Sequence, residues 1–311
     1  MSTPIPTDPA DPSQGEHPLA CTLPLPGITL QGHEWRPERR GQPGAGPSLM
    51  FVHATGFHGR VWDAVIRRLP GRHALALDQR GHGGSQALPF DTWEAFGRDA
   101  AAAAAHWRLQ GAVGVGHSMG GGALVLAAAM APGTFSRLVL VDPVLLAPSA
   151  YFGPPPAAGT APPAANRKSR FDSVEAMVAR FADRPPYAHF TREALWAYCR
   201  HALKPAADGV GLELCCSPAF EASVYAAARH SGLVYAAIRA LQIPVLVVRA
   251  AYPPVPGQPF DPGASPTWPQ AAAEFRHGRE IHLADHQHLV PMQDPDLIAR
   301  LIADECAAAG G

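Results

Sequence analysis

Apolar runs of strand length alternate with segments of helical spacing along the first half of the chain. The runs are residues 48–53 (SLMFVH), 73–78 (HALALD), 112–116 and 138–141. The segments with apolar positions three or four residues apart are 61–69, 93–107 and 119–130. Strands that alternate with helices build right-handed crossover units. The pattern therefore predicts a mostly parallel, twisted sheet with helices on both faces.

The start of the chain follows a different pattern. Residues 1–19 contain acids and prolines where a secretory signal would carry a basic start and an apolar run, so we expect a disordered leader. Two short apolar segments follow, CTLPL and ITLQGHEW, with Pro26-Gly27 between them. Pro-Gly is a turn dipeptide, which predicts that the folded part opens with a hairpin.

The alternation stops at Pro143 and is replaced by a long helical segment. Residues 173–239 show mostly helical spacing and carry many aromatic side chains. Strand-like runs return at 245–248 and 280–283, and a helical segment closes the chain from about residue 294 to 306. The helical segment therefore lies between two strands of one sheet.

These patterns divide the chain into a core and an insertion. We expect the core to comprise residues 20–147 and 242–311, with a helical cap over residues 148–241. Ligands of open parallel sheets bind at the carboxyl ends of the strands, so we expect the cap to cover that edge.

Composition narrows the possible partners. The 311 residues include 25 Lys+Arg and 26 Asp+Glu, so a nucleic acid or an anionic membrane surface is not an expected partner. No run reaches the roughly 20 apolar residues of a membrane-spanning helix. The five cysteines are odd in number and lack C-x-x-C spacing, which is typical of a reducing cytoplasm.

The clearest chemical motif is G-H-S-M-G at residues 116–120, a G-x-S-x-G pattern. It stands between a predicted strand and a predicted helix, the context in which this pattern forms a sharp turn that exposes its serine. Ser118 is therefore a candidate nucleophile. The backbone N–H of Met119, near the positive end of the helix, is a candidate oxyanion donor.

Further motifs surround this one. The chain contains H-x-x-G after the run at 48–53, D-x-R-G-H-G-x-S from residue 78, and H-x-V-P-M-x-x-P from residue 288. Together with G-H-S-M-G-G they resemble the α/β-hydrolase superfamily over about residues 48–303. The resemblance implies an α/β-hydrolase fold and a second oxyanion donor after the first of these strands. By position this donor is Thr55, with Gly56 as the alternative.

A serine hydroxyl needs a base to take its proton, and the chain offers fifteen histidines. His288 follows the last predicted strand and precedes the last helix, where the resemblance places the base. His282, His286 and Asp285 stand close by in sequence and could suggest a metal site. Their spacing matches none of the usual zinc patterns, so we expect neither a metal nor a cofactor.

The acid that orients the histidine has two candidates. In the family that this chain resembles, the acid follows the strand at 245–248 within a few residues, but no carboxylate stands there. Asp261 is the next one, as if about eight residues preceded it as an insertion, and its spacing to His288 favours it. Asp142 ends the run at 138–141, the other place where the superfamily puts its acid.

The resemblance implies a serine hydrolase that acts on a small-molecule carboxylic ester or similar acyl substrate through a Ser-His-Asp triad. Carbon-carbon bond hydrolases and cofactor-free perhydrolases share this triad and are alternatives. A non-catalytic ligand-binding relative is a third. Aromatic residues of the expected cap suggest an apolar acyl or aromatic-ester substrate: Phe171, Phe181, Tyr187, Phe190, Trp196 and Tyr198.

Overall fold

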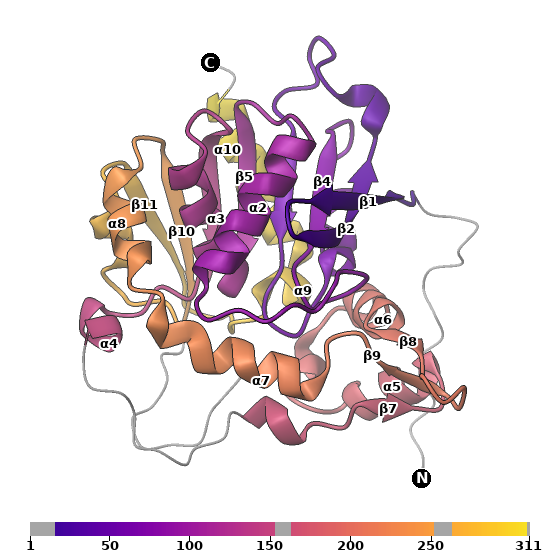
Figure 1. Ribbon diagram of the computed structural model, residues 1–311. Coiled ribbons are helices and arrows are strands. Elements are labelled where there is room, and N and C mark those ends of the chain that lie inside the picture. Colours follow the sequence, from indigo (N-terminus) through magenta and orange to yellow (C-terminus); the bar gives the residue numbers. More distant parts are fainter. Residues whose placement is uncertain (1–15, 153–162, 252–262, 310–311) are drawn as a thin grey trace.

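The computed structural model describes residues 16–152, 163–251 and 263–309. Eight strands of these residues form one sheet, in the order β1-β2-β4-β3-β5-β6-β10-β11 (Figure 1). In that order the strands are Leu19–Leu25, Ile28–Trp35, Ala74–Asp78, Leu49–Val52, Ala112–His117, Phe135–Val141, Val245–Ala250 and Gly278–Leu283. The pairs β1–β2 and β2–β4 are antiparallel and the others are parallel, which confirms the predicted hairpin and the mostly parallel sheet.

The central strands are apolar throughout because both faces of the sheet are covered. In β3 all four residues are fully buried: Met50 and Val52 pack in the core on one face, and Leu49 and Phe51 in the core on the other. Successive side chains of a strand point to opposite faces, so a strand between two helical layers needs an unbroken apolar run.

Helices cover both faces of the sheet, as predicted. On one face α2 packs against α3, and α3 against α8; on the other, α1 packs against α10. Their bounds, with the short α9, are α1 Asp63–Arg67, α2 Glu94–His106, α3 Met119–Met130, α8 Leu233–Ala240, α9 Val290–Gln293 and α10 Pro295–Ala309. Within the described ranges, no helix has the length and apolar character of a membrane span.

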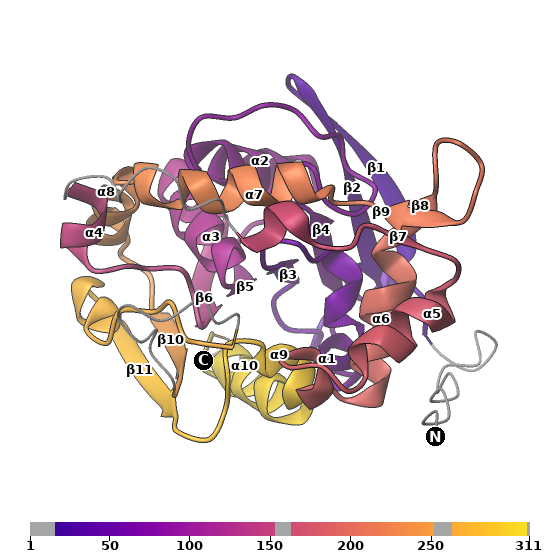
Figure 2. The same cartoon turned by 90° about the horizontal axis from the view of Figure 1, so that it is seen from below.

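The segment between β6 and β10 lies over the carboxyl ends of the strands. Seen from below, α6 and α7 frame the ends of β3, β5 and β6 (Figure 2). Its helices before α8 are α4 Pro148–Phe152, α5 Val174–Phe181, α6 Arg192–His201 and α7 Pro218–Ala227. The last helix, α8, differs from these because it packs on α3 in the core layer.

A small antiparallel sheet in this segment has no counterpart in the sequence prediction. Its order is β7-β9-β8, and its strands are Arg170–Phe171, Leu212–Leu214 and Leu203–Pro205. Strands of two or three residues are too short to show a period of two, and β8 contains a lysine and a proline. Ser173, Thr191 and Ser217 cap α5, α6 and α7 through their side chains, which sets where these helices begin.

Candidate active site

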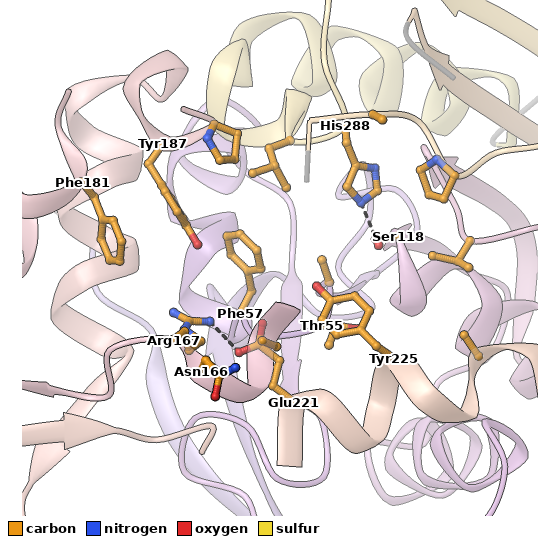
Figure 3. A pocket seen from close by; sticks show the side chains of 18 of the residues that line it. Thr55, Phe57, Ser118, Asn166, Arg167, Phe181, Tyr187, Glu221, Tyr225 and His288 are labelled. Atoms are coloured by element: carbon orange, nitrogen blue, oxygen red, sulfur yellow. Dashed lines mark hydrogen bonds and ion pairs between the residues drawn. The ribbon is translucent and has the colours of Figure 1, made fainter. Parts of the chain in front are cut away.

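Ser118 stands at a sharp turn between β5 and α3. Its backbone angles, φ 57° and ψ −122°, are unusual for a residue with a side chain. The turn puts its hydroxyl at the carboxyl edge of the sheet, on the wall of a pocket (Figure 3). Only 5% of the residue is exposed.

Close backbone packing explains the glycines of the motif. A Cβ on Gly116 would lie 2.6 Å from the Gly120 carbonyl oxygen, and a Cβ on Gly120 would lie 2.3 Å from the Val52 carbonyl oxygen. Real Cβ atoms do not approach backbone this closely, so the turn from β5 into α3 requires both glycines. The glycines thereby allow α3 to pack directly against β3.

We expect Gly120→Ala to lower the free energy of unfolding by about 1–3 kcal/mol or more, because strand backbone must move to admit the methyl group. Gly122→Ala, in the same helix, is the matched control: its Cβ would meet ring atoms of Trp93 only at 3.7 Å, an ordinary contact. This control should be unchanged or up to about 1 kcal/mol more stable. Urea unfolding followed by circular dichroism measures both. Equal stabilities would contradict the packing argument.

His288 reaches Ser118 from the segment between β11 and α9. Its Nε2 lies 2.9 Å from Ser118 Oγ (Figure 3). The backbone around it is held twice, since its N–H donates to the Gly263 carbonyl at 2.9 Å and its carbonyl accepts from His117 Nε2 at 2.9 Å. Burial, followed by the nearby His288, lowers the pKa of His117 to about 3, so His117 is a neutral donor. No sequence signal had pointed to this role for His117.

Asp142 contacts the other ring nitrogen of His288. Its Oδ2 lies 2.6 Å from His288 Nδ1, and the residue is fully buried. Its Oδ1 accepts from the Ala250 N–H at 2.9 Å, Ser265 Oγ at 2.6 Å and Thr267 Oγ1 at 3.1 Å. Burial acts to raise the pKa of this carboxyl, but the hydrogen bond and charge of His288 and the bond from Ser265 hold that pKa below its usual value.

Of the two acid candidates, only Asp142 lies within the described residues. Asp142 directly follows β6 and makes the Nδ1 contact, whereas Asp261, which the chain spacing favoured, lies outside the described residues. The structure brings Ser118, His288 and Asp142 into one hydrogen-bonded series. Ser265 and Thr267, which hold the carboxylate, were not singled out from the sequence because hydroxyl residues in a proline-rich stretch are common in loops.

The two residues expected to supply oxyanion donors are neighbours. The Thr55 hydroxyl lies 3.5 Å from Met119 Sδ. Met119 is the first residue of α3, so its backbone N–H has no acceptor within the helix. The Gly56 N–H already donates to His82 Nε2 at 2.9 Å. This contact leaves the Thr55 N–H as the better candidate for the second donor.

The histidines considered as a metal cluster have separate surroundings. His286 Nε2 lies 3.5 Å from Asp294 Oδ2, His282 is exposed on β11, and His288 points to Ser118. Over the described part of the chain, no three His, Cys, Asp or Glu side chains are arranged to hold a metal ion.

A cavity of about 550 Å³ opens in front of Ser118. Apolar side chains form much of its wall: Ala54, Phe57, Trp93, Val144, Leu146, Phe181, Pro186, Ala228, Ala264 and Leu289. Of the aromatic residues expected to shape it, Phe181 and Tyr187 line it, whereas Phe171, Phe190, Trp196 and Tyr198 pack in the apolar core beside it. The wall also carries an ion pair that no motif indicated, between Arg167 and Glu221.

The sequence of this chain is similar to those of known proteins. Residues 49–301 match the alpha/beta hydrolase family. An sn-1-specific diacylglycerol lipase of Mus musculus is 35% identical over 114 residues, which cover 34% of this chain and 36% of that protein. A pimeloyl-(acyl-carrier protein) methyl ester esterase of Methylococcus capsulatus is 32% identical over 102 residues, covering 32% and 37%. These matches span about a third of each relative's length.

Solved structures agree on the fold. The crystal structure of E-2-(acetamidomethylene)succinate hydrolase superposes with a TM-score of 0.72 at 22% identity, covering 93% of this chain and 98% of that chain. Together with the family match over most of the sequence, this establishes that the chain belongs to the alpha/beta hydrolase family.

Proposed function

We propose that this protein is a serine hydrolase that cleaves a carboxylic ester through a covalent acyl-enzyme. The observation that supports this most is the hydrogen-bonded series from Asp142 through His288 to Ser118, which ends on the wall of a mostly apolar pocket. A buried carboxylate, an imidazole and a serine in this order provide an activated nucleophile.

The first half of the reaction forms the acyl-enzyme. Ser118 Oγ attacks the ester carbonyl carbon while His288 Nε2 takes the hydroxyl proton. The N–H groups of Thr55 and Met119 donate to the oxyanion that develops. When the tetrahedral intermediate collapses, the carbon–oxygen bond to the alcohol breaks, and the imidazolium returns its proton to the departing alkoxide.

The second half releases the acid. Water attacks the acyl carbonyl, His288 accepts one of its protons, and the proton then passes to Ser118 Oγ as the acyl–serine bond breaks. Asp142 accepts the Nδ1–H throughout, so Nε2 keeps its lone pair toward Ser118 and the imidazolium is stabilised when it forms. The reaction consumes one water and needs no cofactor.

Two of the similar proteins carry names of ester chemistry, one a lipase and the other a methyl ester esterase. Carbon-carbon bond hydrolases and perhydrolases would use the same three side chains. These alternatives differ in the bond that is cut and are separated by substrate, not by triad geometry.

Labelling with a fluorophosphonate tests the proposal. We expect the probe to form a covalent adduct whose mass maps to the peptide that contains Ser118, because the probe reacts with serines that a neighbouring base activates. Ser118→Ala should abolish labelling. Ser223→Ala, which removes an exposed hydroxyl bonded to the Phe220 carbonyl on α7, is the matched control and should label fully.

Folded protein that takes no label would favour a non-catalytic ligand-binding relative and overturn the proposal. Labelled protein that hydrolyses no ester would move the function to carbon-carbon bond cleavage or to perhydrolysis.

A further inference from the structure

The pocket in front of Ser118 is rich in positive charge. Four cationic side chains and one carboxylate line it: Arg167, Lys168, Arg180, Arg229 and Glu221. The whole chain, by contrast, is nearly neutral, with a formal charge of −1. The excess of cations is therefore a property of this cavity and not of the protein's composition.

The carboxylates within reach do not offset these cations. Glu221 is already paired with Arg167, whose Nη1 lies 2.6 Å from its Oε2. Across the described residues, no carboxylate lies within ion-pair distance of Lys168, Arg180 or Arg229. The internal segments outside those residues, 153–162 and 252–262, contain a single acid, Asp261.

Burial of the Arg167–Glu221 pair in the pocket wall has a cost in hydration free energy. Side-chain exposure is 17% for Arg167 and 7% for Glu221, and Arg167 Nη2 also donates to the Tyr198 hydroxyl at 2.9 Å. Two charges lose much of their hydration at such a site, and apolar residues of similar volume are often as stabilising. A guanidinium held in place beside a pocket instead suits the recognition of an anion.

The Arg167–Glu221 pair lies close to Gly56, which follows the candidate oxyanion donor Thr55 in the chain, but away from Ser118. A Cβ on Gly56 would lie 2.6 Å from Glu221 Oε1 and 3.3 Å from Arg167 Nη1. Figure 3 shows Arg167 and Glu221 at one side of the pocket and Ser118 at the other, with Phe57 and Thr55 drawn between them. A substrate that reaches both sides would place its carbonyl at Ser118 and its far end at Arg167.

We propose that the natural substrate is an ester with a carboxylate at the end remote from the scissile bond, and that Lys168 and Arg180, the cations without a carboxylate partner among the described residues, bind this carboxylate beside the Arg167–Glu221 pair. This inference rests on the proposed ester hydrolysis. A planar carboxylate matches the fork of a guanidinium, and the apolar wall accommodates the carbon chain between the two ends. The expected substrate thus combines the apolar part that the cap aromatics suggested with a charged end.

Pairs of esters that differ only in charge test the inference. Monomethyl adipate is compared with methyl 6-methylheptanoate, in which an isopropyl group replaces the carboxylate. A carboxylate on the alcohol side is tested with 4-acetoxybutanoate against 4-methylpentyl acetate. Acid release is followed by titration at constant pH. In at least one pair we expect kcat/KM to be about tenfold or more higher for the anion, as for one charge-assisted hydrogen bond.

Variants test whether the preference for anionic esters arises in the pocket. Arg180→Gln and Lys168→Gln should each reduce the ratio of kcat/KM between the anionic and the neutral ester, because each removes a pocket cation that no carboxylate of the described residues offsets. Arg170→Gln is the matched control, because Arg170 is an exposed arginine of β7 paired with Asp208 and does not line the pocket. Its ratio should stay at the value of the unchanged enzyme.

The outcomes separate the two proposals. Equal kcat/KM values in both pairs, or preference for the neutral esters, would overturn the anionic substrate and leave ester hydrolysis standing. No turnover of any ester by labelled protein would overturn the ester reaction itself. A ratio that Arg180→Gln and Lys168→Gln leave unchanged would also overturn the inference, since the selectivity would then arise outside these side chains.

Discussion

Ser118→Ala and His288→Ala are each expected to lower kcat on a short p-nitrophenyl ester by about 10⁴ or more, with folding intact. Without Oγ there is no atom to acylate. Without the imidazole, no other base of the described residues is within hydrogen-bond distance to take the Ser118 proton, since His288 Nε2 is the group at 2.9 Å. Steady-state kinetics measures the loss, and circular dichroism checks the fold.

The double variant shows whether the two residues act as one unit. We expect it to be about as slow as either single variant, because each change alone already removes the activated nucleophile. His286→Ala is the matched control, since this histidine stands two residues away and faces Asp294 at 3.5 Å. Its activity should stay near that of the unchanged enzyme. A double variant far slower than both singles would indicate two independent sites and contradict the assignment.

Asp142→Asn should lower kcat by up to about 10⁴, while KM changes little. The Ala250 N–H and the Ser265 hydroxyl already donate to Oδ1, so the amide oxygen of the new side chain should take that place. The amide nitrogen then faces His288 Nδ1 as a donor and forces the ring proton onto Nε2. In that tautomer Nε2 has no lone pair for the Ser118 proton.

Asp261→Asn is the comparison that decides between the two acids, and we expect it to be mild. The chain spacing favoured Asp261, whereas the contact at His288 Nδ1 favours Asp142. Both variants are assayed on the same ester, and their thermal unfolding is compared. A nearly normal Asp142→Asn beside a crippled Asp261→Asn would return the acid to Asp261 and leave Asp142 as a structural strand end.

Local sequence determined the order of elements and the position of the proposed nucleophile. The apolar run of β3 is unbroken because both sheet faces are covered, so it could be identified as a buried strand without any tertiary information. The glycines at 116 and 120 needed only their neighbours in the chain to mark a sharp turn at Ser118. His288 was proposed as the base because the family resemblance places the base between the last strand and the last helix, a position that can be located from chain order.

Tertiary structure decided what depends on neighbours in space. Asp142 can meet His288 because β10 pairs with β6 on one side and with β11 on the other, and no spacing along the chain expresses these pairings. Arg167 and Glu221 are 54 residues apart, in a loop and in α7, and neither belongs to a motif. Folding brings charged residues that are far apart in sequence to one site, and only then does the site have a net charge of its own. The cationic wall of the pocket could therefore not be predicted from a chain of nearly zero net charge.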